Sequence, residues 1–324
     1  MTLGYKFVPF PDSVARRRRD EACHDRVIDG TISGALRCVW TTEQPVHVGS
    51  GFKGLVGGVV VREAARVRNR PGIPGSSLRG ALRSRFEAIT RSCAPKPPRE
   101  QRGLRSTSFP AWTAEVAHSA IKLPVFTDCR DDVLCPACAL FGKMSLRSRV
   151  AVEDLGVAND TTNFSIDRMP SQFSPNLHHV GVPTPDHGKR VVHVDRLHGR
   201  KFAVHPAPLI ERPELQAVEA IPTKTGLVGE IRVVNLRPHE LGGLLVALGQ
   251  TAPGTFDAVK LGGGKCHGFG RMRLQSLAFA ARRGPPHPLA SDPRVDEWLA
   301  AFRADADRFE AGERRLLEIH RGDC

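Results

Sequence analysis

The stretch PGIPGSSLRGALRSRFEAI, at positions 71–89, constrains the fold of this 324-residue chain more than any other segment. Its apolar residues recur at helical spacing, at Leu78, Leu82, Phe86 and Ile89. Such a narrow apolar face must be covered by a core, so the stretch predicts an amphipathic helix packed on other elements. Ser76 or Ser77 can cap its first turn, because a hydroxyl oxygen there accepts an otherwise unpaired backbone N–H.

Three arginines share this helix with the apolar face. Arg79 and Arg83 lie one turn apart on its flank, toward the end where the helix dipole is positive. Arg85 projects in nearly the same direction as the leucines, so its guanidinium must reach out of the core or meet an anion. The helix therefore predicts packing on one side and anion contacts on its flank.

The net charge of the chain is +13, and its isoelectric point is near 9.9. Between Arg62 and Arg105, eleven Arg and one Lys face three Glu, a local balance of +9. A basic stretch can be only a solvated surface, but the guanidinium fork of arginine suits phosphate groups particularly well. The charge therefore favours an anionic partner, and nucleic acid in particular.

Helical and period-two patterns both occur along the chain. Residues 28–40 and 225–236 alternate apolar with small or polar residues, as strands do. Residues 237–249 have helical spacing that ends at Gly249, and the last forty residues predict one or two further helices. The chain is therefore expected to have an α+β fold.

Two glycine-rich segments predict flexible loops. One covers residues 47–58, and the other, LGGGKCHGFG at 261–270, leads into a strand that starts at Arg271. Glycine lets backbone N–H groups approach an anion closely. The second loop precedes a strand rather than a helix and has no Walker lysine, which argues against a dinucleotide or P-loop site. The loops therefore favour a polymeric phosphate.

Cys129, Cys135 and Cys138 have the spacing C-x5-C-x2-C. A C-x2-C pair lets two thiolates bind one ion, and a closed structural zinc site needs four ligands. Cys93 is the predicted fourth ligand, with His118 as the alternative. Buried cysteines without a metal are the other interpretation. The predicted role of the zinc is structural, because four protein ligands leave no open coordination position.

Together, four motifs resemble the RAMP superfamily, the repeat-associated proteins of CRISPR systems. They are HVGSG (47–51), IPGSSLRGALRSRFE (73–87), CPACALFG (135–142) and LGGGKCHGFGRMRL (261–274). The chain is most similar to the backbone subunits of type III effectors. The resemblance implies a ferredoxin-like, RRM-type palm in βαββαβ order. It also implies subunits that stack along a CRISPR RNA, paired to complementary target RNA, with other effector subunits as partners.

The resemblance further implies which side chains contact RNA phosphates. They are Lys53 in the first glycine segment, Arg79 and Arg83 on the helix, and Lys265, His267 and Arg271 in and after the second glycine segment. Aromatic residues make up only 6% of the chain. This composition suits a grip on the RNA backbone better than stacking on bases.

On this resemblance, one RAMP domain spans residues 1–324. Its expected parts are a palm at about 27–92, 145–160 and 225–280, a zinc-knuckle insertion at 93–144, a thumb-like hairpin insertion at 161–224, and C-terminal helices at 285–320. The insertions interrupt the palm, so its strands come from distant parts of the sequence.

RAMP members that cleave target RNA place an aspartate just before a valine-rich element, where it serves metal-assisted cleavage. This chain has Gly57 and Gly58 ahead of Val59. Glu63 is the nearest carboxylate, and it is better explained as the partner of a neighbouring arginine. We therefore expect a scaffold subunit that lacks its own cleavage aspartate.

Two alternatives stay open. The first is an endoribonuclease of the same superfamily, which cuts target RNA with Glu63 and Mg²⁺ or repeat RNA with a histidine. The second is a zinc-stabilised, RRM-like adaptor that recruits a partner protein. No apolar run approaches the ~20 residues of a membrane span, and the N-terminus lacks a secretory-signal pattern. We therefore expect a cytoplasmic protein without membrane contact.

Overall fold

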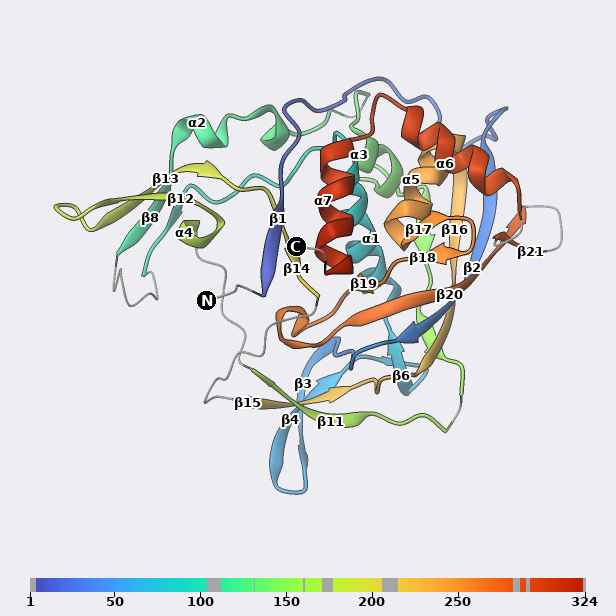
Figure 1. Ribbon diagram of the computed structural model, residues 1–324, viewed down its shortest axis with the longest axis horizontal. Helices are drawn as coiled ribbons and strands as arrows, with labels where there is room; N and C mark the ends of the chain where they lie inside the picture. The colour runs from blue at the N-terminus through green and yellow to red at the C-terminus, as the bar shows by residue number, and fades with distance from the viewer. Residues whose placement is uncertain are drawn as a thin grey trace.

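The computed structural model describes residues 4–103, 112–130, 132–159, 161–170, 177–205, 215–281, 286–289 and 292–322. Its centre is a nine-stranded antiparallel sheet in the order β19-β20-β2-β16-β10-β6-β5, in which β9 also pairs with β16 and β21 with β20 (Figure 1). These strands are β2 (Ile32–Thr42), β5 (Arg66–Val67), β6 (Arg70–Ile73), β9 (Val150–Val152), β10 (Leu155–Val157), β16 (Gly226–Leu236), β19 (Val259–Lys260), β20 (Arg271–Ala281) and β21 (Pro286–Pro288).

The connections through this sheet are ferredoxin-like. Strand β2 is followed by helix α1 (Gly75–Ile89), then by β9, β10 and β16, then by helix α5 (Pro238–Leu248), and then by β20. In space β2 and β16 lie in the middle, with β20 on one side and β9 and β10 on the other. This is the ferredoxin-like βαββαβ arrangement, so the predicted α+β fold class is confirmed.

One face of the central sheet is buried under helices. Leu36, Cys38 and Trp40 of β2 point to that face and are at most 1% exposed, whereas Arg37 and Val39 between them are exposed. Helices α1 and α5 pack together on the buried face, and further helices lie against them (Figure 1). These are α3 (Pro136–Phe141), α6 (Arg294–Ala304) and α7 (Glu310–Arg321). None of the described helices combines the length and hydropathy that a membrane span requires.

Helix α1 begins two residues earlier than a Ser76 cap predicts, and three earlier than a Ser77 cap predicts. Pro74 occupies the N-cap position, and no side chain of the cap residue accepts a hydrogen bond. Instead, the N–H of Gly75 donates to Asp154 Oδ1 at 2.7 Å. A Cβ on Gly75 would lie 2.2 Å from the carbonyl oxygen of Val152. The prediction of Ser76 or Ser77 was wrong because the cap comes from a residue distant in sequence.

Four smaller sheets surround the palm. Two are four-stranded, with the orders β11-β15-β4-β3 and β12-β13-β8-β7, and two are pairs, β1-β14 and β17-β18. Their strands are β1 (Tyr5–Val8), β3 (Gly49–Val56), β4 (Val59–Ala64), β7 (Glu100–Gln101), β8 (Thr113–Val116), β11 (Ser165–Pro170), β12 (Gly181–Asp186), β13 (Val191–Leu197), β14 (Arg200–Ala203), β15 (Leu215–Ala220), β17 (Gln250–Ala252) and β18 (Thr255–Phe256). The remaining elements are α2 (His118–Ile121), α4 (Leu177–Val180) and the 3₁₀ turns Pro124–Phe126 and Lys265–His267.

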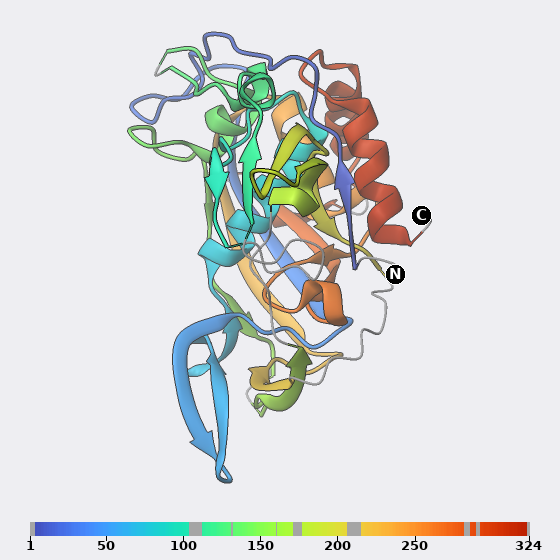
Figure 2. The same ribbon diagram turned by 90° about the vertical axis from the view of Figure 1, so that its left-hand side faces the viewer.

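The first glycine-rich segment forms a hairpin rather than the expected loop. Strands β3 and β4 are joined by a tight turn at Gly57 and Gly58, whose φ angles are +55° and +78°. Two successive positive φ angles match the twist of a two-residue hairpin turn and favour glycine at both positions. The hairpin projects from the body of the molecule, with Phe52 and Leu55 more than 70% exposed (Figure 2).

The residues predicted to form a thumb-like insertion, 161–224, contribute strands to three different sheets. Strands β11 and β15 pair next to the hairpin, β12 and β13 pair beside β8, and β14 pairs with β1. Strand β14 brings the chain back beside helix α1.

Candidate nucleic-acid interface

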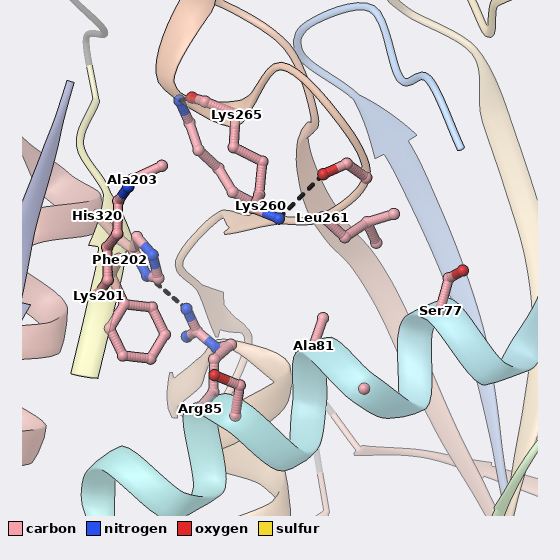
Figure 3. Close-up of a pocket in the computed structure, with 13 residues that line it drawn as sticks. Ser77, Ala81, Arg85, Lys201, Phe202, Ala203, Lys260, Leu261, Lys265 and His320 are labelled. Atoms are coloured by element: carbon pink, nitrogen blue, oxygen red, sulfur yellow. Dashed lines mark hydrogen bonds between the residues drawn. The ribbon is translucent and has the colours of Figure 1, made fainter. Parts of the chain in front are cut away.

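A cavity of about 240 Å³ lies between helix α1 and the second glycine-rich loop (Figure 3). The helix contributes small residues, namely Ser77, Gly80, Ala81 and Ser84. The other walls come from β14, from residues 260–265 and from His320 on α7. None of the described residues that line this groove is acidic.

The second glycine-rich loop bends tightly along the groove. Four of its glycines, Gly262, Gly264, Gly268 and Gly270, have φ angles between +66° and +85°, a region that residues with a side chain rarely adopt. The N–H of Gly263 donates to the carbonyl oxygen of His47 at 2.8 Å. The beginning of the first glycine-rich segment therefore touches the second loop, and the second loop lines the cavity beside helix α1.

Three lysines face the groove. The ammonium of Lys260 donates to the carbonyl oxygens of Val204 and Lys265, at 2.9 and 2.8 Å, and burial lowers its pKa to about 8. Burial also lowers the pKa of Lys265, whose ammonium donates to Gly262 O at 2.9 Å. Lys201 is exposed at the rim, with its ammonium 3.7 Å from the centre of the Tyr5 ring. Within the described lining, these cations have no carboxylate beside them, so the groove is suited to an anion.

Arg85 lies at the inner end of the groove, joined to His320 (Figure 3). Its Nε donates to Ala247 O at 2.6 Å, and one of its terminal nitrogens donates to His320 Nδ1. Burial lowers the pKa of Arg85 to about 10, and burial together with the Arg85 charge lowers that of His320 well below its ordinary value. At neutral pH the pair is therefore a guanidinium cation and a neutral imidazole. Among the described residues, no carboxylate forms a salt bridge with Arg85.

Gly80 is exposed on the groove side of α1. A Cβ at this position would meet no atom within 4 Å, so packing inside the chain does not require glycine. Glycine within a helix costs about 1 kcal/mol relative to alanine. The position instead leaves the helix backbone open to whatever occupies the groove.

Arg79 and Arg83 project from the opposite flank of α1, away from the groove. Arg79 donates to the carbonyl oxygen of Phe141, and Arg83 donates to that of Gly142 at 3.0 Å. Arg83 also binds Glu87 at 2.9 Å. Burial alone would lower the pKa of the Arg83 guanidinium, but the hydrogen bond and charge of Glu87 outweigh it and raise this pKa.

The other three side chains expected at RNA phosphates lie in different surroundings. Lys53 is exposed on β3 of the hairpin, outside the groove. His267 is half-buried in the 3₁₀ turn of the second glycine-rich loop. Arg271 is buried, pairs with Glu43 and donates to His320 O at 2.9 Å. Of the six predicted contacts, only Lys265 lines the groove.

The sulfurs of Cys93, Cys129, Cys135 and Cys138 lie within 4.8 Å of one another. Cys93 Sγ is 3.5–3.9 Å from each of the other three sulfurs. A tetrahedral zinc ion with Zn–S bonds of about 2.3 Å holds neighbouring sulfurs about 3.8 Å apart, so the spacing fits. Backbone N–H groups also point to two sulfurs, from Cys135 to Cys129 at 3.2 Å and from Cys138 to Cys135 at 3.5 Å. The four thiols can therefore hold a metal ion, and His118 is not a member of the cluster.

Glu63, the weak catalytic candidate, lies on β4, where its Oε2 is 3.9 Å from an Arg66 nitrogen. It belongs to neither of the two groups of metal-ligating side chains in the described part of the chain. The second of these groups joins His239, Asp305 and Asp307. The negative charge of this second group is already balanced within the chain. The carboxylate of Asp307 binds two arginines near the N-terminus, Arg17 and Arg19, each at 2.7 Å.

Sequence reasoning missed several groove residues: Gly80, Lys201, Lys260 and His320. Glycine is unfavourable inside a helix, so a glycine such as Gly80 in a predicted helix can indicate a position where a ligand approaches closely. Lys201 and His320 carry no such signal, because β14 and α7 meet the groove only through the tertiary fold.

A model of the RAMP superfamily matches residues 40–273, from the end of β2 into β20. The matched range covers more than two thirds of the chain, and it includes helix α1, all four clustered cysteines and the second glycine-rich loop. No curated protein matches the chain.

Proposed function

Because this chain belongs to the RAMP superfamily, we propose that it is an RNA-binding subunit of a CRISPR ribonucleoprotein. More specifically, we propose that it is a CRISPR-RNA-binding backbone subunit of a type III-like effector. Its partners are then the CRISPR RNA, the complementary target RNA and other effector subunits.

The observation that carries this proposal is the groove between α1 and the second glycine-rich loop. Its described lining holds Arg85, Lys201, Lys260 and Lys265 and no carboxylate. A ribose-phosphate strand supplies the missing negative charge, and the attraction does not depend on base sequence. A backbone subunit needs this kind of contact, because the sequence of the guide changes while the protein does not.

The helix and the loop have complementary roles in the proposed grip. Gly80 lets the RNA backbone approach α1, and the left-handed turn at Gly262 brings the loop backbone to the opposite side of the same groove. Lys265 and Lys201 supply the positive charge, and Lys53 can extend the contact from the hairpin. Arg271 contacts RNA only if it exchanges Glu43 for phosphate.

Arg79 and Arg83 lie on the other flank of the helix. Each donates to a carbonyl oxygen beside the cysteine cluster, which directs its guanidinium away from the groove. In our proposal they support the helix from behind the groove.

We propose that Cys93, Cys129, Cys135 and Cys138 hold a structural zinc ion. When bound, zinc would supply a cross-link between the segment after α1 and the segment that leads into α3. Four thiolates leave no open position for water or substrate, so we assign no catalytic step to this site.

We propose that the subunit does not cleave RNA itself. Gly57 and Gly58 occupy the turn of the β3–β4 hairpin, and the nearby Glu63 faces Arg66. Mg²⁺ enters the proposal only if the chain cuts RNA. Incubation of the loaded complex with labelled target RNA tests this, since Mg²⁺-dependent cuts that disappear in Glu63→Ala would reassign the chain as an endoribonuclease.

Measured RNA affinity at several salt concentrations tests the grip. For single strands, the logarithm of the binding constant falls with log salt by about 0.7 per neutralised phosphate. Lys265→Glu and Lys201→Glu should each lower the affinity at least about fivefold and flatten this slope. Lys122→Glu, an equally large charge change at an exposed site near α2, should do neither. Equal effects of the three variants would contradict binding in the groove.

A further inference from the structure

Glu87, near the C-terminal end of α1, binds two arginines from different parts of the chain. Its Oε1 accepts a hydrogen bond from Arg83 Nε at 2.9 Å, and its Oε2 accepts one from Arg200 Nη1 at 2.8 Å. Glu87 is 8% exposed, and the side chain of Arg200 is 9% exposed. A carboxylate held between two guanidinium groups and shielded from water fixes their positions closely.

Both arginines also hold the chain around the cysteine cluster. Arg83 donates to Gly142 O at 3.0 Å, and one of its nitrogens lies 3.9 Å from Cys138 Sγ. Arg200 donates to Cys93 O at 2.8 Å. Cys93 and Cys138 come from the two segments that the cluster joins, so the Arg83–Glu87–Arg200 bridge is attached to both.

The same bridge reaches the two facing walls of the groove. Arg83 is followed by Ser84, which lines the groove from α1. Arg200 begins β14, and the next residues, Lys201 to Ala203, line the opposite wall. The bridge therefore connects each wall of the groove to the segments that carry the cysteines.

Electrostatics gives this connection a dependence on the metal. A zinc ion with four thiolates carries a net double negative charge, and Arg83 and Arg200 are the guanidinium groups held beside it. The positions of Gly142 O and Cys93 O depend on the two cysteine segments being closed around the ion. Without the ion, these carbonyls lose their fixed spacing, because the binding free energy of a structural metal is part of the folding free energy.

We propose that Glu87, bridged to Arg83 and Arg200, is a positioning residue that makes the grip on single-stranded RNA depend on the metal in the cysteine cluster. This inference rests on the proposed RNA groove. It makes the cysteine cluster a regulator of binding, so that chelation or thiol oxidation would release RNA without any chemistry at the groove.

The coupling is tested by a cycle of two changes, zinc removal and Glu87→Gln. The affinity of the full chain for a single-stranded RNA of fixed sequence is measured in each state, and the metal content is measured by atomic emission. Zinc removal by chelator should lower the RNA affinity of the native chain about tenfold. Glu87→Gln, loaded with one zinc per chain, should already bind about three- to tenfold more weakly. Chelation of this variant should then change its affinity less than about twofold, because the link between metal and groove is broken. Glu230→Gln, which removes a half-buried partner of Arg37 and Arg232 outside the groove, is the matched control and should behave like the native chain.

The outcomes separate this inference from the proposed function. If the zinc-loaded native chain binds no RNA, the proposed function fails and the inference fails with it. If it binds RNA and zinc-loaded Glu87→Gln binds equally well, only the coupling is wrong. Fully additive effects of chelation and Glu87→Gln would also overturn it. Arg200→Lys repeats the test if Glu87→Gln does not fold, because lysine keeps the charge but lacks the planar fork whose two terminal nitrogens reach Glu87 and Cys93 O separately.

Discussion

Helix α1 has two flanks that differ in almost every physical respect. The groove flank carries Ser77, Gly80, Ala81 and Ser84, all small side chains without charge, and its one charged residue, Arg85, lies buried at the inner end. The metal flank carries Arg79, Arg83 and Glu87, which are engaged with carbonyl oxygens and with each other around the cysteine cluster. The side that faces the proposed ligand is therefore the side with the smallest residues.

This difference has a simple physical explanation. A polymer backbone must come close to a helix to collect several weak contacts, and long side chains would hold it away. The positive charge for RNA can come from the facing wall, where Lys201 and Lys265 lie. Arg79 and Arg83, on the other flank, can therefore stabilise the fold. Substitutions on the metal flank should therefore change mainly the stability, and substitutions on the groove flank should change mainly the RNA affinity.

The largest effect is expected on the metal flank. Cys135→Ser removes one of four clustered sulfurs and should lower the free energy of unfolding by at least about 4 kcal/mol, because loss of a metal ligand is among the most damaging single changes. Thermal unfolding together with zinc content checks this. Cys23→Ser, at a cysteine outside the cluster, is the control and should retain zinc. Full zinc content in Cys135→Ser would show that the cluster is not a four-thiolate site.

The next effect contrasts the two flanks directly. Ser84→Glu places a carboxylate in the groove and should lower RNA affinity more than about tenfold while changing stability by less than about 0.5 kcal/mol. Arg79→Ala removes a hydrogen bond to Phe141 O and should cost about 1 kcal/mol of stability, with RNA affinity within about twofold of native. Paired measurements of melting temperature and affinity separate the two results.

The reverse pattern for Arg79→Ala would be equally informative. A tenfold loss of affinity at unchanged stability would mean that Arg79 leaves Phe141 O and binds phosphate, as the sequence resemblance implies. The comparison between the flanks would then describe only the RNA-free protein.

A smaller effect is expected at the centre of the groove flank. Gly80→Ala should stabilise the free protein by about 0.5–1 kcal/mol, because alanine favours the helix and the new methyl group meets no neighbour. It should nevertheless weaken RNA binding by about threefold or more by holding the strand away from the helix. Ser76→Ala, on the exposed first turn, should not weaken binding. A Gly80→Ala variant that is more stable and binds RNA normally would remove close approach from the explanation.

The sequence predicted the fold better than it predicted the groove. The apolar spacing of Leu78, Leu82 and Phe86 predicted helix α1, and the alternation over residues 28–40 predicted a strand where β2 (Ile32–Thr42) lies, because both patterns are local. The cysteine set followed from spacing in the same way, with Cys93 as the added fourth member.

The groove could not be predicted from the sequence, because its residues meet only through tertiary contacts. Arginines on an exposed helix flank look alike in sequence whether they meet phosphate or a carbonyl oxygen such as Phe141 O. Lys201 enters the groove only because β14 pairs with β1 and returns to α1. The first glycine-rich segment was misjudged because Gly57 and Gly58 suit a hairpin turn as well as an anion-binding loop. The valines that flank them were the better signal.

The smallest expected effect is a pH dependence, because a lysine of the groove loses its proton at a lower pH than the arginines of the metal flank do. The pKa of Lys260 is lowered to about 8 by burial, so this groove charge is largely lost as the pH rises from 7 to 9, whereas the guanidinium groups of the metal flank stay charged. RNA affinity should therefore fall by about threefold over this range. The stability of the free protein should change in the opposite direction. The unfolded state binds more protons between about pH 8 and the ordinary lysine pKa, so the free energy of unfolding gains a rising contribution there. Lys260→Met should remove both trends, and affinity that still falls in this variant would place the titrating group elsewhere.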